Sequence, residues 1–142
     1  MIDIVKVTSC NEVYRAAIQR FLNQLTSTPV DFNEEAFATL LADEGSHLFL
    51  MLQNEVPVGM LTVGTYCSPT GKKAWIEDVV VDSSCRGQGL GKQLVEFAID
   101  YVRSLQIPLL MLTSNPKRVA ANVLYQSLGF SRKETNVYRM KF

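Results

Sequence analysis

The segment Arg86-Gly87-Gln88-Gly89-Leu90-Gly91-Lys92 has the composition of a phosphate-binding turn. Its three glycines permit backbone dihedral angles closed to other residues, and they let a ligand approach without meeting a β-carbon. The run stands between a predicted strand and a predicted long helix, where free N–H groups and the positive end of the helix dipole meet. Arg86 and Lys92 add positive charge. These features predict a pyrophosphate site, and an unliganded tight turn that caps a helix is the alternative.

Two other phosphate-binding motifs do not fit this segment. The fingerprint G-x-G-x-x-G requires a glycine where Lys92 stands. The motif G-x-x-x-x-G-K-[ST] requires one more residue before the second glycine, and Gln93 follows the lysine. Spacing therefore excludes both the dinucleotide-binding turn and the P-loop.

Glu77 and Asp78 are carboxylates inside an otherwise apolar predicted strand that ends at Val81. A carboxylate there must lie in a cleft or be paired, so Glu77 is a candidate general base that acts directly or through water. A salt-bridged or edge-exposed glutamate is the alternative. Strand alternation predicts that Glu77 and Asp78 point to opposite faces, and we favour Glu77 as the base.

Two further side chains could in principle do chemistry. His47 is the only histidine, and it begins a predicted strand without a neighbouring nucleophile motif, so we interpret it as structural. Cys85 precedes Arg86 near a helix N-terminus and could act as a nucleophile in a two-step transfer. We read it instead as an ordinary loop thiol.

The elements that position these residues follow from hydrophobic periodicity. A short strand at residues 2–7 is followed by Thr8-Ser9, which would cap a helix with an apolar stripe at spacings of four, three and four. A second helix begins at Asn33. Three strand-like runs follow, at Leu48 to Leu52, Val56 to Tyr66 and Trp75 to Val81.

After Gly89 the apolar period changes to that of a long helix. Ile107 to Thr113 is a predicted strand, Asn115 and Pro116 begin a predicted last helix, and Gly129 ends it. Phe130 to Arg132 and Val137 to Met140 are predicted to form a closing hairpin. The order predicts an α/β protein with a mixed sheet covered by helices.

These residues resemble the GNAT acetyltransferase superfamily. Its signature for the pyrophosphate of coenzyme A, [QR]-x-x-G-x-[GA], is met by Arg86, Gly89 and Gly91. Residues 76–81 look like the fourth strand of the family, and residues 121–130 look like its last helix with the ending L-Y-x-x-x-G-F. The segments lie in the family's order.

The resemblance implies a fold and a co-substrate. It implies one GNAT domain over residues 1–142, with a mixed, mostly antiparallel sheet, helices on both faces, and a cofactor cleft where the fourth and fifth strands splay. It also implies that acetyl-CoA binds with its pantetheine along the backbone of Val79, Val80 and Val81 and its pyrophosphate at residues 86–92.

The resemblance further implies residue roles. Tyr125 matches the tyrosine that donates a proton to the departing thiolate, whereas from its helical spacing alone it would be a packed core aromatic. A backbone N–H near Val79 would stabilise the acetyl oxyanion. Asn122 would hydrogen-bond acetyl-CoA or else face solvent, and Arg118 stands where many relatives carry asparagine.

The expected function is transfer of an acetyl group from acetyl-CoA to a primary amine of a small molecule or peptide, by direct attack in a ternary complex. A non-catalytic acyl-CoA sensor or regulatory module is the alternative. Acceptor choice would depend on the segments at residues 25–37 and 66–73, which carry no recognisable motif.

Composition excludes several partners. Fourteen basic and fourteen acidic residues balance, so no bulk charge favours a nucleic acid or an anionic membrane. No run approaches the roughly 18 apolar residues of a membrane span, no secretory signal begins the chain, and the three cysteines form no C-x-x-C pair. We expect a cytoplasmic enzyme without a structural metal, in which an exposed edge of the closing hairpin could pair two copies.

Overall fold

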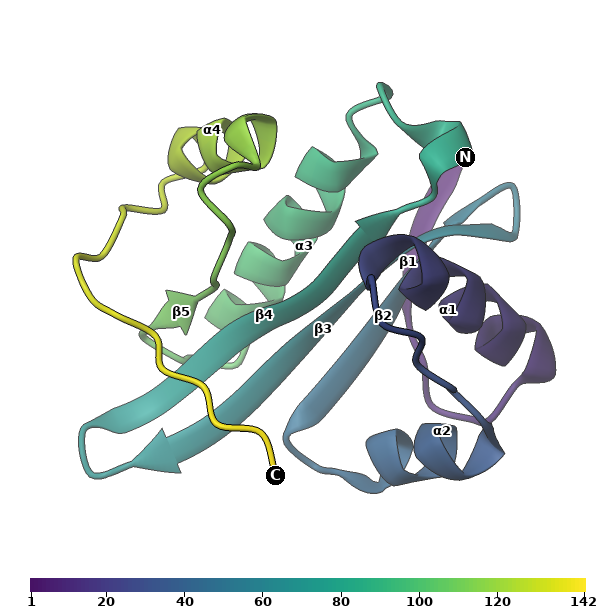
Figure 1. The fold of residues 1–142 in the computed structure, drawn as a ribbon, viewed down its shortest axis with the longest axis horizontal. Coiled ribbons are helices and arrows are strands. Elements are labelled where there is room, and N and C mark those ends of the chain that lie inside the picture. Colours follow the sequence, from purple (N-terminus) through teal and green to yellow (C-terminus); the bar gives the residue numbers. More distant parts are fainter. The chain divides into compact units, whose positions relative to one another are not determined.

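The computed structural model describes all 142 residues, which form two compact units, Met1–Leu112 and Thr113–Phe142. The first unit contains a five-stranded sheet with three α-helices, and the second contains one α-helix and an irregular tail (Figure 1). Neither unit holds a helix that combines the length and the apolar character needed to cross a membrane.

The helices and strands of the first unit follow one another in nearly the order that the hydrophobic pattern predicts. They are, in chain order, β1 (Ile2–Lys6), α1 (Glu12–Leu25), α2 (Glu34–Ala42), β2 (Ser46–Gln53), β3 (Val56–Ser68), β4 (Gly71–Val81), the 3₁₀ helix η1 (Ser83–Cys85), α3 (Leu90–Ser104) and β5 (Leu110–Met111). The strands lie in the order β1-β2-β3-β4-β5, antiparallel except for the parallel pair β4–β5. The predicted α/β class with a mixed, mostly antiparallel sheet is confirmed.

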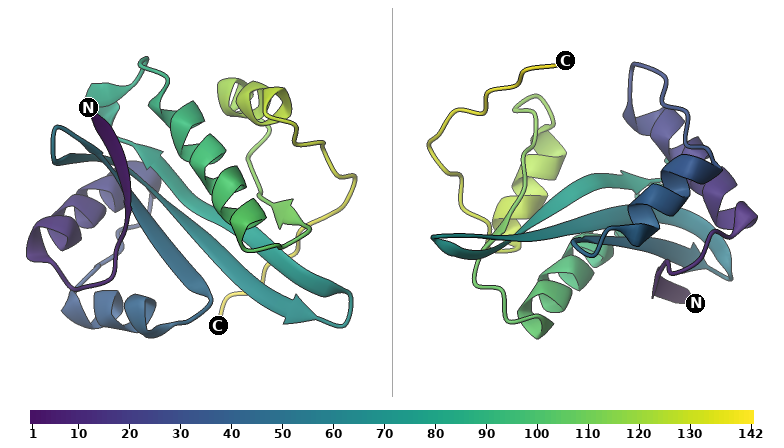
Figure 2. Two further views of the ribbon diagram at one scale, coloured as in Figure 1. Left: turned by 180° about the vertical axis from the view of Figure 1, so that it is seen from behind. Right: turned by 90° about the horizontal axis from the view of Figure 1, so that it is seen from below.

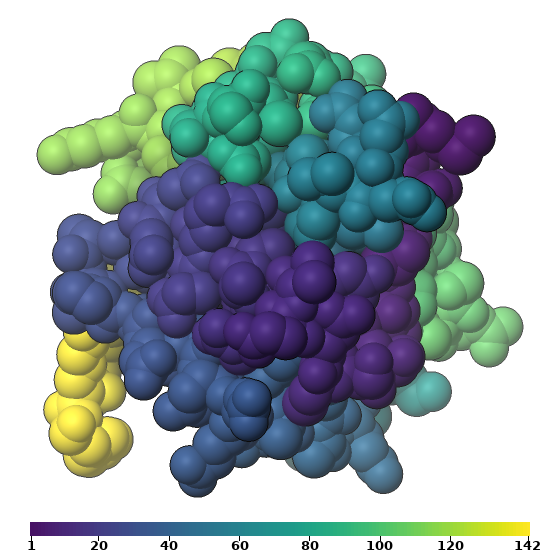
Figure 3. Space-filling view, turned by 90° about the vertical axis from the view of Figure 1, so that its right-hand side faces the viewer, coloured from purple at the N-terminus to yellow at the C-terminus, as the bar shows by residue number.

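Helices cover both faces of this sheet. Helices α1 and α2 lie on one face and α3 on the other (Figure 2). Under α1 and α2, Phe21 and Phe37 pack in one apolar cluster with Leu50, Met60 and Val80 of the sheet. The atoms of these two helices, purple to blue, form a continuous layer on the side shown in Figure 3. Burial of this cluster fixes which side chains of each strand point to that face.

The start of α1 differs from the prediction. Thr8-Ser9 does not cap it. The side chain of Asn11 does, by accepting a hydrogen bond of 3.2 Å from the backbone N–H of Tyr14. Serine and asparagine are equally good N-caps, but Asn11 directly precedes the first helical residue, Glu12, and Ser9 lies two residues earlier. The cap of α2 is confirmed, because Asn33 accepts from the N–H of Ala36 at 2.8 Å.

The last strand of the sheet is much shorter than predicted. Of the expected residues 107–113, only Leu110 and Met111 form a strand, and they pair with Ala74 and Trp75. From Ile76 onward β4 has no strand partner on that side. The two strands therefore separate toward the end of β4 that leads to the glycine-rich turn, which confirms the predicted splay.

In the second unit, helix α4 spans Val119–Ser127 and ends as predicted at Gly129. Gly129 has a φ of +101°, and the N–H of Phe130 donates to the carbonyl of Tyr125 at 3.0 Å. This is a Schellman motif, completed by edge-on contact between the two aromatic rings. The predicted start at Asn115 is early, because its side chain caps a turn by accepting from the N–H of Lys117 at 2.9 Å.

The predicted closing hairpin is absent. No residue after Met111 forms a strand, so Phe130 to Arg132 and Val137 to Met140 are irregular. Val137, Tyr138 and Met140 are exposed, and strand-forming residues that bury nothing cannot stabilise a two-stranded hairpin in water. The expected pairing of two copies through that hairpin therefore loses its basis.

Candidate active site

The glycine-rich turn connects η1 to α3. Gly87 and Gly89 have φ values of +84° and +74°, both in the left-handed region that favours glycine. A β-carbon added at either position would meet no protein atom within 4 Å. The space over the turn is therefore open, and the left-handed conformations explain two of its three glycines. Gly91 is different, because a β-carbon there would contact Val81 Cγ2 at 3.8 Å.

The backbone of this turn offers donors without acceptors. Gly89 is the N-cap of α3 and contributes no side-chain cap. None of the backbone N–H groups from Arg86 to Lys92 donates a hydrogen bond to the protein. Such groups at the head of a helix are the donors that phosphate oxygens accept from most readily. Buried Leu90 anchors the first turn of α3, so the helix end holds its position.

Charge at the turn is free to meet a ligand. The side chains of Arg86 and Lys92 are exposed, and neither forms an ion pair with the protein. The Oε1 atom of Gln88 accepts from Nε2 of Gln53 at 3.4 Å, which links the turn to the end of β2. Open glycine positions, unpaired N–H groups and unpaired cations all fit a diphosphate such as that of acetyl-CoA.

A hydrogen-bonded latch holds the chain just before the turn. Asp82 accepts from the backbone N–H of Ser84 at 3.1 Å and from Nε of Arg20 at 3.3 Å, and Gln24 Oε1 accepts from the N–H of Ser83 at 2.9 Å. The N–H of Ser84 and the Arg20 guanidinium hold the pKa of Asp82 below its usual value. Helix α1 thereby fixes the segment that leads into the glycine-rich turn.

Sequence analysis missed this latch. An Asp followed two residues later by Ser is a recognisable turn signal, so Asp82 and Ser84 could have been found. Arg20 and Gln24 could not, because they lie about 60 residues earlier in the chain and only the fold brings α1 to the end of β4.

Strand β4 contains a β-bulge at its carboxylates. Met60 of β3 faces Val80 and Thr62 faces Glu77, so Asp78 and Val79 together oppose a single residue. Asp78 has a φ of +51°. The extra residue shifts the alternation of the strand after Asp78. Glu77 pairs with Thr62 and Asp78 opposes Leu61, the adjacent residue of β3, so the register agrees with the prediction that the two carboxylates point to opposite faces. The bulge puts Glu77 on the same face as Val80, the face that α1 and α2 cover further along.

The surroundings of both carboxylates raise their pKa values. Both side chains are exposed, but neighbouring atoms displace enough water to raise the pKa of Glu77 above its usual value, and the negative charge of Asp78 raises it further. Desolvation also raises the pKa of Asp78. A carboxylate with a raised pKa that forms no salt bridge is a better proton acceptor than an ordinary surface glutamate.

In the second unit, Asn122 is engaged locally. Its Nδ2 donates to the carbonyls of Arg118 at 2.7 Å and Asn115 at 3.0 Å. The amide therefore fastens the first turn of α4 and has only its Oδ1 atom free. The donor side of the amide is thus used within the chain, and a hydrogen bond from acetyl-CoA to Asn122 stays a prediction.

The ring of Tyr125 is buried and packs edge-on against Phe130, with 6.1 Å between ring centroids. Its hydroxyl forms no hydrogen bond with the protein. Packing and the Schellman motif therefore fix the position of the ring, and its hydroxyl has no partner within the protein.

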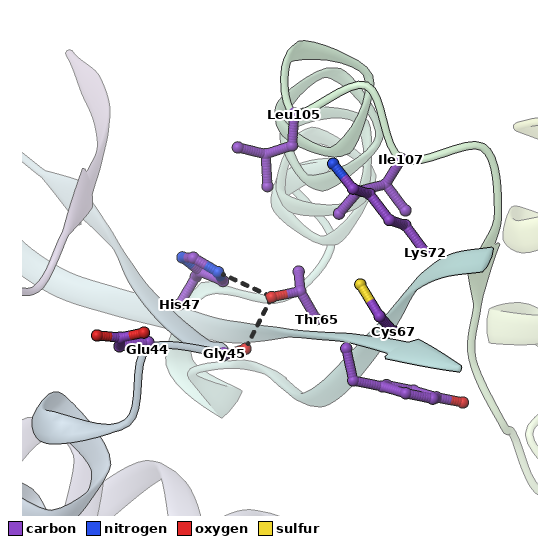
Figure 4. Close-up of a pocket in the computed structure, with 9 residues that line it drawn as sticks. Glu44, Gly45, His47, Thr65, Cys67, Lys72, Leu105 and Ile107 are labelled. Carbon is purple, nitrogen blue, oxygen red and sulfur yellow. Dashed lines mark hydrogen bonds between the residues drawn. The ribbon is translucent and has the colours of Figure 1, made fainter. Parts of the chain in front are cut away.

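A second hollow lies elsewhere on the first unit. It has a volume of about 410 Å³ and lies beyond the C-terminal end of α3, between His47, Thr65, Lys72 and Ile107 (Figure 4). His47 Nδ1 is 3.0 Å from the Tyr101 hydroxyl and Nε2 is 3.3 Å from Thr65 Oγ1, so both ring nitrogens are engaged as a structural role requires. Burial and the nearby Lys6 lower the pKa of His47. The hollow is a helix length of roughly 22 Å from the glycine-rich turn.

Cys85 does not lie in that hollow. Its thiol is 3.6 Å from the hydroxyl of Ser84, and no histidine or carboxylate lies within hydrogen-bonding distance of it. The structure thus gives no general base to a nucleophilic Cys85.

Comparison with known proteins agrees with this geometry. Residues 11–130 match the acetyltransferase (GNAT) family. A glucosamine 6-phosphate N-acetyltransferase of Arabidopsis thaliana is 30% identical over 128 residues, which are 84% of each chain. The crystal structure of the enzyme of that name and organism superimposes with a TM-score of 0.80 at 26% identity, over 99% of this chain and 98% of that one. A Trypanosoma brucei acetyltransferase shares the fold at 24% identity, with a TM-score of 0.79 over the whole of both chains.

The match to the family runs through the glycine-rich turn, both carboxylates of β4 and helix α4. It includes every residue that the sequence singled out for cofactor binding or proton transfer. The chain belongs to the GNAT family of acetyltransferases, enzymes whose co-substrate is acetyl-CoA.

Proposed function

We propose that this enzyme transfers the acetyl group of acetyl-CoA to a primary amine of a small molecule or peptide, by direct attack in a ternary complex. The observation that carries the proposal is the unbroken run of unpaired N–H groups from Arg86 to Lys92 beside the splayed end of β4. Acetyl-CoA supplies an activated thioester, and the chain supplies binding, orientation and proton transfer.

The cofactor-binding residues lie along one path. The N–H groups of Arg86, Gly87, Gln88, Gly89, Leu90, Gly91 and Lys92 would hold the pyrophosphate, with the two cations adding charge. The backbone of Val79, Val80 and Val81, which has no strand partner on the β5 side, would hydrogen-bond the pantetheine. Asn122 would contribute indirectly, by fixing the first turn of α4.

Three groups would carry the chemistry. Glu77 would accept a proton from the ammonium of the acceptor, directly or through a water molecule. A backbone N–H near Val79, freed from regular pairing by the bulge, would stabilise charge on the acetyl oxygen. Tyr125 would donate a proton to the departing thiolate.

We further propose that the two compact units function as one acetyltransferase domain over residues 1–142. The family match supports this, because it begins in α1 and ends after α4. The proposed base and pyrophosphate site belong to the first unit, whereas the proposed acid belongs to the second. Neither unit would be active by itself.

Release of free coenzyme A tests the function directly. The protein is incubated with acetyl-CoA and each of a panel of amines: amino sugars, aminoglycosides, polyamines and lysine peptides. Glucosamine 6-phosphate is tested first, because a relative with 84% coverage bears its name. Thiol release above the blank without amine supports the transferase. Tight binding of acetyl-CoA with no release for any amine would favour the alternative, a non-catalytic acyl-CoA sensor.

The pH dependence tests the base. A carboxylate base works above its pKa, so kcat/KM falls as pH falls through the pKa of Glu77, which desolvation and Asp78 raise. Removing the neighbouring charge with Asp78→Asn lowers that pKa, so the acidic limb should move to lower pH. Glu77→Gln should remove the limb. The measurement is a pH–rate profile of kcat/KM for all three proteins; a limb that Asp78→Asn leaves in place contradicts the assignment of Glu77.

A further inference from the structure

Within the first unit, one part of the sheet face opposite α3 extends beyond the cluster that α1 and α2 cover. Along β3 the face continues from Met60, beneath α1 and α2, to Thr62, Gly64 and Tyr66. Along β4 it continues from Val80 across the bulge to Glu77, Trp75 and Lys73. The register pairs these residues directly, as Thr62 with Glu77, Gly64 with Trp75, and Tyr66 with Lys73. The candidate base thus begins a row of side chains that continues away from the α1–α2 core.

The middle of this row consists of two aromatic side chains and a glycine. The indole Nε1 of Trp75 donates to the hydroxyl of Tyr66 at 3.4 Å, which joins the two rings across the strands. Tyr66 is 49% exposed. Opposite Trp75 stands Gly64, where an added β-carbon would meet nothing within 4 Å, and its φ lies outside the left-handed region. Neither sterics nor backbone conformation explains a glycine in the middle of this strand, where it costs stability.

The row carries a negative charge at one end and a positive charge at the other. Glu77 stands on the near side of Trp75, and Lys73 stands beyond it, with its Nζ donating to Ser68 Oγ at 2.8 Å. Side chains two residues apart on a strand are separated by about 6.6 Å, so a compact molecule spans Glu77 and Trp75. An ammonium group would be attracted to Glu77 and to the aromatic faces and repelled by Lys73.

We propose that Gly64, Tyr66 and Trp75 form the acceptor subsite of this enzyme, and that the acceptor is a small amine carried on a saturated ring, an amino sugar. The C–H face of the ring would pack on Trp75 over the space left by Gly64, with its amine directed to Glu77. The inference rests on the proposed function, because it takes Glu77 as the base.

The same face disfavours a peptide acceptor. Extended peptides are bound chiefly through backbone hydrogen bonds at a free strand edge. Here the backbone of β3 is paired on both sides and that of β4 at Trp75 is paired with both β3 and β5, so only side chains are offered. A compact ring suits such a surface better than an extended chain.

Trp75 is the only tryptophan of the protein, so its fluorescence reports on the subsite without any turnover. Glucosamine and glucosamine 6-phosphate are titrated into the protein in the presence of coenzyme A. We expect a saturable change in tryptophan emission for at least one of them and none for a lysine peptide at the same concentration. A response to the peptide alone, or to no amine sugar, overturns the proposal.

Gly64→Val separates binding at this surface from folding. Valine favours strands and its β-carbon would meet no protein atom, so the melting temperature should stay the same or rise. Its side chain would fill the proposed space, so the acceptor Kd from fluorescence and the acceptor KM should both rise by about 10-fold, while the Kd for acetyl-CoA stays within about two-fold. Gly64→Ala should show a smaller effect in the same direction.

The outcomes are separable. If the wild-type protein releases no coenzyme A with any amine, the proposed function fails, whereas the fluorescence titration still tests the subsite. If the wild-type protein turns over and Gly64→Val leaves the acceptor KM unchanged, the subsite is wrong and the transferase stands. Should Gly64→Val fail to fold, the graded comparison between wild type and Gly64→Ala decides.

Discussion

Gly89→Val should abolish binding of acetyl-CoA. Gly89 has a φ of +74° at the N-cap of α3, a conformation in which a β-branched residue carries strain of about 1–3 kcal/mol. The added side chain would also enter the open space that the phosphates require. Together these effects should raise the Kd for acetyl-CoA by more than about 100-fold, since each 1.4 kcal/mol is a factor of ten. Isothermal titration calorimetry measures the change.

Gly71→Val is the matched control. Gly71 also has a positive φ, +116°, and an added β-carbon there would also meet no protein atom. It lies in the turn between β3 and β4, at the opposite end of β4 from the glycine-rich turn. The control therefore carries backbone strain without touching the proposed phosphate site, and thermal melting shows whether the two variants are equally destabilised. Equal Kd values for wild type and Gly89→Val would contradict the assignment of the turn.

Local signals predicted most of the fold. The glycine-rich turn, the caps at Asn33 and Gly129, and the apolar period of α3 are each determined by neighbouring residues, and each is confirmed. The predicted cap of α1 at Thr8-Ser9 lies two residues too early, because both that pair and Asn11 have side chains that can cap a helix. Errors of this size are typical where several residues compete for the same helix end.

The larger errors concern pairing, which a single sequence does not encode locally. Val137 to Met140 include residue types that favour strands, but their side chains stay exposed and no strand forms. At Asp78 the sequence looks like a regular strand, but the structure has a β-bulge there. The bulge changes which face of the sheet the following side chains point to. The phase change is visible only when Ile76 and Val80 are both found buried, on different faces of the sheet.

The candidate site likewise contains some residues that the local sequence predicts and others that it does not. Residues 86–92 could be proposed as an anion site from composition and spacing, because the features that favour anion binding belong to the backbone of one short segment. The contributions of Arg20 and Gln24, and the opposition of Gly64 and Trp75, depend on contacts between elements that are distant in the chain. Residue type alone cannot indicate such contacts.

Tyr125→Phe should lower kcat by about 100-fold or more while leaving the Kd for acetyl-CoA within about two-fold, because it removes a proton donor and keeps the ring. The ring contact with Phe130 and the Schellman motif do not involve the hydroxyl, so α4 should fold normally. Tyr14→Phe in α1 is the control, since that hydroxyl forms no hydrogen bond and Tyr14 packs against the core at a distance from any proposed role. Steady-state kinetics and calorimetry on both variants separate chemistry from binding. If Tyr125→Phe and Tyr14→Phe turn over equally fast, the proton reaches the thiolate from another source, and water is then the remaining donor to examine.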